Sequence, residues 1–219
     1  ASDSRSIEQT SPDPAEATAT EQTTPAETTP ATTPEAEQST AAPTLEPTPE
    51  AAGGTALAML DGLEEKGRAP KTGYDRDSFG WRRDIDRNGC DTRNDILRRD
   101  LHQITLKAGT DGCVVLRGAL LSPYSGDTVD FDRTDSTVDI DHVVALSDAW
   151  QTGAAGWGEE LKREFANDPL NLLAVEAGLN RQKGDGDAAT WLPPKRDYRC
   201  EYVGRQIAGK DKYGLRVQP

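Results

Sequence analysis

Apolar side chains recur at helical spacing in two segments of the chain. In residues 55–66 they are Leu57, Leu60 and Leu63. In residues 92–105 they are Ile96, Leu97, Leu101 and Ile104. This spacing places each set on one face and predicts a helix in each segment. Thr92, with Asp95 three residues later, is typical of a capped helix start.

Shorter apolar runs between turn residues predict strands further along the chain. The strands 113–121 and 128–131 flank the turn 123–126 and predict a hairpin. The elements expected next are a strand at 137–144, helices at 146–153 and 157–166, a strand at 171–176 and a helix opened by Gly178. This order predicts a single α+β domain over residues 55–219.

Residues 1–54 differ in composition from the rest of the chain. Thr, Pro, Ala and Glu dominate, and residues 1–55 contain no Phe, Trp, Tyr or Lys. Such a segment cannot bury enough apolar surface to offset its conformational entropy, so we expect a disordered tail. Two interpretations stay open: a wall-spanning or interdomain stalk carrying O-linked sugars, and a plain solubilising linker.

The tail carries most of the negative charge. Residues 1–55 hold one basic and ten acidic residues, a net charge of −9, whereas the whole chain carries −13. Only −4 is left on residues 56–219. Because a catalytic cleft needs local positive charge, the acidic balance does not exclude a nucleic-acid substrate. No apolar run reaches membrane-spanning length, and no signal peptide is recognised.

The spacing of four polar residues indicates a catalytic site. Asp141 and His142 are adjacent in the 137–144 strand, Asn171 follows 29 residues after His142, and Asn180 nine residues after Asn171. Each residue alone is an ordinary strand, turn or helix residue, whereas the joint pattern is rare. It resembles the HNH (His-Me finger, ββα-metal) nucleases. The resemblance implies a ββα-metal finger within the domain and hydrolysis of phosphodiesters.

The resemblance implies a role for each residue. His142, whose unperturbed pKa lies near neutrality, is expected to be the general base that activates water. Asp141 and Asn180 offer one anionic and one neutral oxygen to a divalent metal, Mg²⁺ or alternatively Mn²⁺. Asn171 is expected to complete the catalytic motif by tying the His-bearing loop to the next strand. Two basic residues of the last helix are placed to meet phosphates: Lys183 and Arg181.

The resemblance extends over about residues 55–217. It is carried by the segments 67–76, 89–94, 139–144, 149–154, 165–168, 180–185 and 191–194. Together they resemble the secreted actinobacterial HNH proteins, which are related to the C-terminal nuclease domain of GmrSD-type restriction enzymes. That kinship implies metal-dependent DNA cleavage. It does not settle whether RNA is also cleaved. The insertion between His142 and Asn171 is long. Its residues Trp150, Trp157 and Arg163 either belong to the core or shape the substrate cleft. The core is favoured for both tryptophans.

Residues 84–95 have the spacing of an EF-hand calcium loop. The ligands would be Asp84, Asp86, Asn88 and Asp95. Asp stands at the twelfth position, where EF-hands carry Glu, and no helix is predicted before the loop. A structural Ca²⁺ site and a tight turn leading into the helix are therefore both open.

Three cysteines allow one disulfide and leave one thiol over. Cys90 and Cys113 flank the 92–105 helix, and a link between them would staple that helix to the following strand. Oxidised pairs persist in secreted proteins, so we expect this link, with Cys200 as the competing partner. Neither C-x-x-C nor Cys/His zinc spacing occurs.

Two functional hypotheses follow. The first is a monomeric, secreted or cell-wall-associated HNH endonuclease that cuts DNA, with RNA as an open alternative, and has little sequence specificity. A single divalent metal would stabilise the leaving oxygen. The second is a wall-associated binding module that keeps the fold without activity. The complete polar set of the motif argues against this second hypothesis. No G-x-S-x-G, H-E-x-x-H or P-loop motif is present.

Removal of residues 1–54 should leave the melting temperature nearly unchanged, because a disordered tail contributes nothing to a core. Scanning calorimetry of the full and truncated chains measures this. A markedly lower melting temperature of the truncated chain would instead mean that the tail packs on the domain.

Overall fold

The computed structural model describes residues 55–135 and 137–219. The tail predicted for residues 1–54 lies outside the described residues, so its disorder and its boundary stay predictions. Helices and strands are mixed throughout the described part, which confirms the predicted α and β content. None of the helices in residues 55–219, position 136 aside, is long and apolar enough to cross a membrane.

The first sheet contains three antiparallel strands. They are β1 (Leu101–Leu106), β2 (Val115–Leu121) and β3 (Thr128–Asp132), in that order. β2 and β3 form the predicted hairpin, with Ala119 opposite Asp130. β1 pairs with β2, with Leu101 opposite Leu120. The sequence analysis was wrong about β1, because it continued the preceding helix to residue 105.

Helix α2 spans Thr92–Asp100 and ends where the chain begins to pair with β2 as strand β1. Leu101 already has an extended backbone, with φ −95° and ψ 148°. The Asp100 carboxylate accepts a hydrogen bond from the backbone of Ala174 at 2.8 Å, which an extended helix would displace. The helix start also differs from the prediction. Asp91, rather than Thr92, is the capping residue, and its carboxylate accepts the N–H of Asn94 at 2.8 Å.

The second sheet pairs β4 (Val138–His142) with β5 (Leu172–Glu176) in antiparallel register, with Asp141 opposite Leu173. Helix α5 (Ala177–Lys183) follows β5 directly. Both strands and this helix match the predicted elements. The segment between the strands contains α3 (Leu146–Thr152) and α4 (Glu159–Asn167), also as predicted, and the short 3-10 turns η2 (Ala154–Gly156) and η3 (Pro169–Asn171).

The remaining helices lie at the two ends of the described residues. Helix α1 spans Ala56–Gly62, but Leu57 is 66 % exposed, so the three predicted leucines do not share one buried face. Helix α6 (Arg199–Tyr213) is missing from the predicted elements. Its apolar spacing is interrupted by Gln206 and Lys210, which are nevertheless buried. Two short 3-10 turns complete the list, η1 (Asp77–Phe79) and η4 (Arg196–Tyr198).

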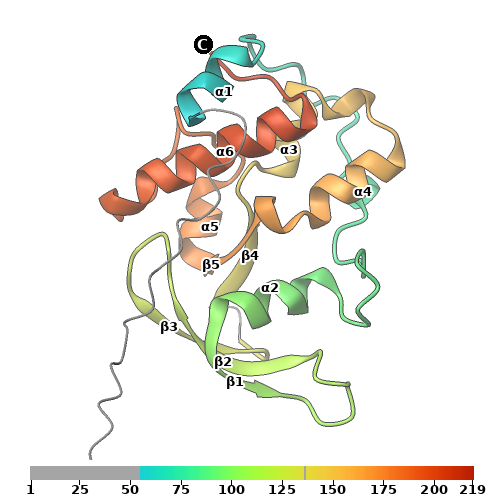
Figure 1. Ribbon diagram of the computed structural model, residues 1–219, viewed down its shortest axis with the longest axis vertical. Coiled ribbons are helices and arrows are strands. Elements are labelled where there is room, and N and C mark those ends of the chain that lie inside the picture. The colour runs from blue at the N-terminus through green and yellow to red at the C-terminus, as the bar shows by residue number, and fades with distance from the viewer. Residues whose placement is uncertain (1–54, 136) are drawn as a thin grey trace, which may run out of the picture. The chain divides into compact units, whose positions relative to one another are not determined.

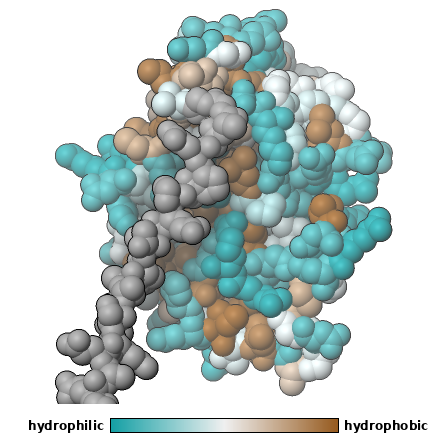
Figure 2. All heavy atoms as spheres, in the orientation of Figure 1, coloured by the Kyte–Doolittle hydropathy of each residue, from teal (hydrophilic) through white to brown (hydrophobic). Residues whose placement is uncertain are grey.

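The β4–β5 pair lies between two groups of elements (Figure 1). One face packs on α2 and the three-stranded sheet through Val138, Ile140, Leu172 and Ala174. The other face packs under α5 and α6 through Leu173 and Val175, together with Tyr124 and Tyr202. A third cluster joins α3 and α4 to Phe79 and Leu215. Figure 2 shows hydrophilic residues over most of the visible surface, with apolar ones scattered between them.

The predicted disulfide between Cys90 and Cys113 is confirmed. Cys90 directly precedes the α2 cap, and Cys113 lies two residues before β2, so the link joins the start of the helix to the sheet that the helix covers. Cys200 is free and exposed.

Replacing both Cys90 and Cys113 by Ser should lower the free energy of unfolding by about 3 kcal/mol, because the denatured chain regains the entropy of the closed loop. Guanidinium unfolding of the oxidised protein measures this. The matched control is Cys200→Ser, which should change stability by less than about 0.5 kcal/mol. Equal stability of the double variant and the parent would contradict the prediction.

Candidate functional site

The carboxylate of Asp141 is a buried charged group at the end of β4. Residues two apart on a strand point to the same side, so Asp139 and Asp141 both face α5. Asp141 is 4 % exposed. Its Oδ1 accepts a hydrogen bond from Lys183 Nζ at 2.9 Å, and its Oδ2 accepts one from the Tyr124 hydroxyl at 2.5 Å. The same ammonium also contacts the His142 carbonyl at 2.7 Å.

This arrangement gives a buried charge a buried partner. A carboxylate enclosed without one would be costly, whereas the ion pair and the hydroxyl together satisfy it. Burial, followed by the charge of Asp141, raises the pKa of Tyr124 well above its ordinary value, so the hydroxyl keeps its proton and donates. Each carboxylate oxygen of Asp141 has two lone pairs and accepts one of these bonds, which leaves acceptor capacity on both.

The His142 ring is held in one orientation. Its Nε2 lies 2.8 Å from the carbonyl oxygen of Ala166 in α4, and Trp81 packs against the ring edge-on at a centroid distance of 4.9 Å. Burial lowers the pKa of His142 to about 3, and the charges of Arg76 and Lys183 lower it further against the Ala166 hydrogen bond. The ring is therefore neutral. Because a carbonyl only accepts, the proton lies on Nε2 and Nδ1 keeps its lone pair.

Asn171 joins the turn after β4 to the start of β5. Its side-chain oxygen accepts the N–H of Val144 at 2.7 Å, and its amide donates to the Val144 carbonyl at 3.2 Å. Its own carbonyl accepts the N–H of Val143 at 2.8 Å. Asn171 is 2 % exposed. In this position it fixes the backbone that follows His142.

Asn180 projects from α5 towards β4. Its amide nitrogen donates to Asp139 Oδ2 at 3.2 Å, which leaves its oxygen available. A cavity of about 70 Å³ lies beside it, with a lining that includes Arg76, Asp141 and His142. The structure therefore brings Asp141, His142 and Asn180 together at one cavity.

The two basic residues of α5 lie in different surroundings. Lys183 is buried and paired with Asp141, while Arg181 is exposed on the helix surface. Their contacts with phosphates stay predictions.

The proposed calcium loop is away from this cavity and is closed on itself. The backbone N–H of Asn88 contacts Asp84 and Asp86 at 3.1 and 3.2 Å, and its amide donates to Asp86 and Asp95. Gly89 adds a further bond to Asp84 at 3.0 Å. These bonds describe a tight turn ahead of α2, and Ca²⁺ binding stays a prediction.

Three residues of the site were missed by sequence reasoning: Tyr124, Arg76 and Trp81. They come from the β2–β3 turn and from the segment around η1, far from the motif in sequence. No local pattern marks them as neighbours of His142. Of the insertion residues, Trp150 and Trp157 pack on the cluster of α3 and α4, as favoured, and Arg163 is exposed.

Comparison with known proteins adds a family. Residues 91–218 match the family described as GmrSD restriction endonucleases, C-terminal domain. A protein of Arthroderma benhamiae, described as an uncharacterized secreted protein, is 40 % identical over 167 residues, which cover 74 % of this chain and 78 % of that protein. No solved structure matches the chain.

Lys183→Met should lower the free energy of unfolding by about 3–5 kcal/mol, because the Asp141 carboxylate then stays buried without its cation. Urea unfolding measures the change. Lys107→Met is the matched control. Lys107 is exposed, and its side chain forms no hydrogen bond or ion pair within the described residues, so this change should shift stability by less than about 0.5 kcal/mol. Adding Asp141→Asn to Lys183→Met should recover part of the loss. A further loss in that double variant would refute the ion-pair explanation.

Proposed function

The chain belongs to the family of GmrSD restriction endonuclease C-terminal domains, a nuclease family, and on that premise we propose that it is a secreted, metal-dependent HNH endonuclease. It hydrolyses phosphodiester bonds of DNA with little sequence specificity. The observation that supports this proposal is the meeting of Asp141, His142 and Asn180 at one polar cavity.

His142 is suited to the role of general base. Its Nε2 is engaged by the Ala166 carbonyl, which leaves Nδ1 as the ring nitrogen that can accept a proton. Among the described residues Nδ1 has no hydrogen-bond partner, and the ring lines the cavity. In the proposed reaction Nδ1 takes the proton of the attacking water.

The oxygens around the cavity fit a hard divalent cation. Asp141 keeps lone pairs on both carboxylate oxygens, and Asn180 keeps its amide oxygen. Within the part of the chain that the structure describes, no three His, Cys, Asp or Glu side chains form a metal-holding group. So sparse a set suits Mg²⁺, with Mn²⁺ as the alternative, because Mg²⁺ retains waters and takes phosphate oxygens. A bound divalent ion would supply charge stabilisation at the leaving oxygen.

The family supports a nucleic-acid substrate, and the secreted relative supports an extracellular location. The remaining parts of the proposal are our own. The chain acts outside the cell as a monomer on DNA, with RNA as an additional substrate to be tested, and the tail associates it with the cell wall. The second hypothesis, an inactive wall-associated binding module, would keep the fold without turnover. The two are separated by plasmid nicking with and without EDTA.

His142→Ala should lower the cleavage rate by about 10²–10⁴-fold, because the water loses its proton acceptor. Plasmid nicking measures this, and circular dichroism checks the fold. His102→Ala is the matched control: His102 is the other histidine, exposed on β1, and should keep the parent rate. Parent-like turnover of His142→Ala would remove His142 from the role of base.

Asn180→Ala should weaken Mg²⁺ and Mn²⁺ binding by at least about tenfold, because it removes an oxygen at the cavity. Titration calorimetry of both metals measures the affinities. Gln182→Ala, an exposed amide on the same helix, is the control. Unchanged affinity in Asn180→Ala would place the metal elsewhere.

A further inference from the structure

Arg76 connects the small cavity to a larger cleft. It lines the 70 Å³ cavity with Asp141 and His142. Arg76 also lines a cleft of about 610 Å³ whose walls include Trp81 and Arg82. Arg76 therefore borders both the candidate site and the cleft along the loop after η1.

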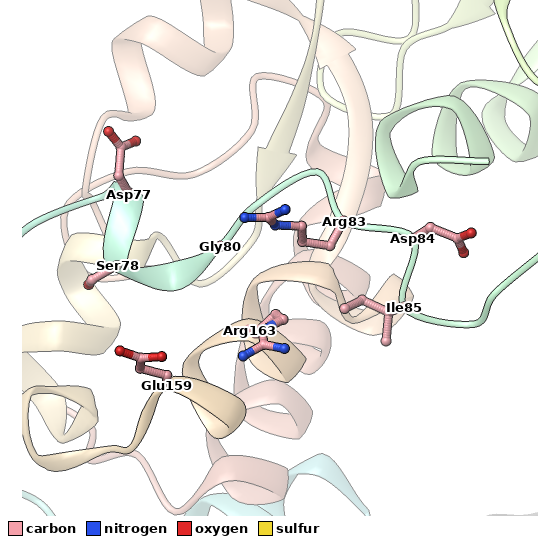
Figure 3. A pocket seen from close by; sticks show the side chains of 8 residues that line it. All are labelled: Asp77, Ser78, Gly80, Arg83, Asp84, Ile85, Glu159 and Arg163. Atoms are coloured by element: carbon pink, nitrogen blue, oxygen red, sulfur yellow. The ribbon is translucent and has the colours of Figure 1, made fainter. Parts of the chain in front are cut away.

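The cleft continues beyond that loop. Arg83 and Gly80 line both the 610 Å³ cleft and a neighbouring one of about 710 Å³, which Arg163 of α4 also lines. Figure 3 shows Arg83 and Arg163 extending into this second space from different elements, while the Asp84 carboxylate points away from it. Gly80 has a positive φ of 58°, a backbone conformation that residues with a side chain rarely adopt.

The loop that carries Arg82 and Arg83 is held from two sides. The Arg83 N–H donates to the Asn167 side-chain oxygen at 3.1 Å, and its carbonyl accepts from the Thr92 hydroxyl at 2.5 Å. Arg82 has a positive φ of 70°, which non-glycine residues rarely adopt. Trp81, between the loop and His142, packs against two core clusters. The arginines are thus presented by backbone that is ordered before any ligand binds.

Four arginines line the two clefts. Within residues 55–135 and 137–219, no ion pair involves these four: Arg76, Arg82, Arg83 and Arg163. After burial, Arg82 is the largest cause of the lowered pKa of Arg93 on α2, which shows like charges crowded at the edge of the cleft. Three acidic residues occur in the lining of the 710 Å³ cleft as well: Asp77, Asp84 and Glu159. Repulsion retained in a pre-ordered cleft points to an anionic ligand.

We propose that these four arginines form a phosphate-binding track that holds one nucleic-acid strand beside the cavity. Arg76 contacts the phosphodiester that is cleaved, and the other three bind the backbone that flanks it. This inference rests on the proposed nuclease function and assigns its substrate path. Three of the four precede residue 91, where the match to the family begins, so the segment around η1 supplies most of the track.

Binding is tested apart from cleavage, in the full-length His142→Ala protein with EDTA. The probe is a fluorescein-labelled single-stranded DNA of 20 nucleotides, followed by anisotropy at several salt concentrations. Adding Arg82→Gln and Arg83→Gln should weaken binding roughly 10- to 100-fold. The slope of log K against log salt should become shallower by about 1.4, because each lost phosphate contact in a single strand contributes about 0.7.

The control removes the same charge elsewhere. Lys107→Gln with Arg117→Gln changes two exposed cations, one directly after β1 and one on β2, and it should weaken binding far less. Arg163→Gln, on a different element, should weaken binding as well, which guards against a folding defect of the loop. Parent-like binding by the Arg82/Arg83 variant, or equal weakening by the control, would overturn the track, as would a parent that does not bind the probe.

Cleavage kinetics separate the track from the chemistry. In the otherwise native chain, Arg82→Gln with Arg83→Gln should raise KM and keep kcat, whereas Arg76→Gln should lower kcat. If DNA binding depends on the arginines but the chain does not cleave DNA, the proposed function is refuted and the phosphate-binding track is supported. If the chain cleaves DNA but its binding does not depend on the arginines, only the phosphate-binding track is refuted.

Discussion

The buried pair of Asp141 and Lys183 is the interaction on which the candidate site depends. It joins the end of β4 to the end of α5, and the Tyr124 hydroxyl adds the β2–β3 turn to the same carboxylate. A charge enclosed to this extent requires a partner, so none of these elements can move without exposing an uncompensated ion. The three elements therefore keep a fixed relation, and the cavity between Asp141, His142 and Asn180 takes its shape from it.

The long insertion between β4 and β5 contributes directly to this geometry. Helix α4 within it supplies the Ala166 carbonyl that orients the His142 ring, and Asn167 next to it accepts a bond from Arg83. Asn171 closes the insertion by clamping Val144. The long insertion departs from the family pattern. It nevertheless fixes the positions of the His142 imidazole, the turn after β4 and the loop that carries Arg83 relative to one another.

Electrostatics divide the site into two parts. Inside, burial lowers the pKa of His142, and the Lys183 ammonium neutralises the Asp141 carboxylate. Outside, arginines without ion partners among the described residues line the approach. An acidic chain can therefore present a locally positive path, since a field near a surface depends on nearby charges more than on the total.

The sequence alone predicted the strands β4 and β5, helix α5 and the spacing of Asp141, His142, Asn171 and Asn180. These follow from local periodicity and from a motif whose members lie close along the chain. It also indicated the Cys90–Cys113 pair, which flanks a single helix. It misplaced β1, because Leu101 and Ile104 suit helix and strand equally and only pairing with β2 decides between them. It missed α6, whose buried Lys210 is acceptable only opposite Asp148.

The partners of the site, Tyr124, Trp81, Arg76 and the Ala166 carbonyl, come from segments distant in sequence. Only the packing of the β4–β5 pair between its neighbours brings them to His142 and Asp141, because contacts of this kind are set by tertiary structure and leave no local pattern.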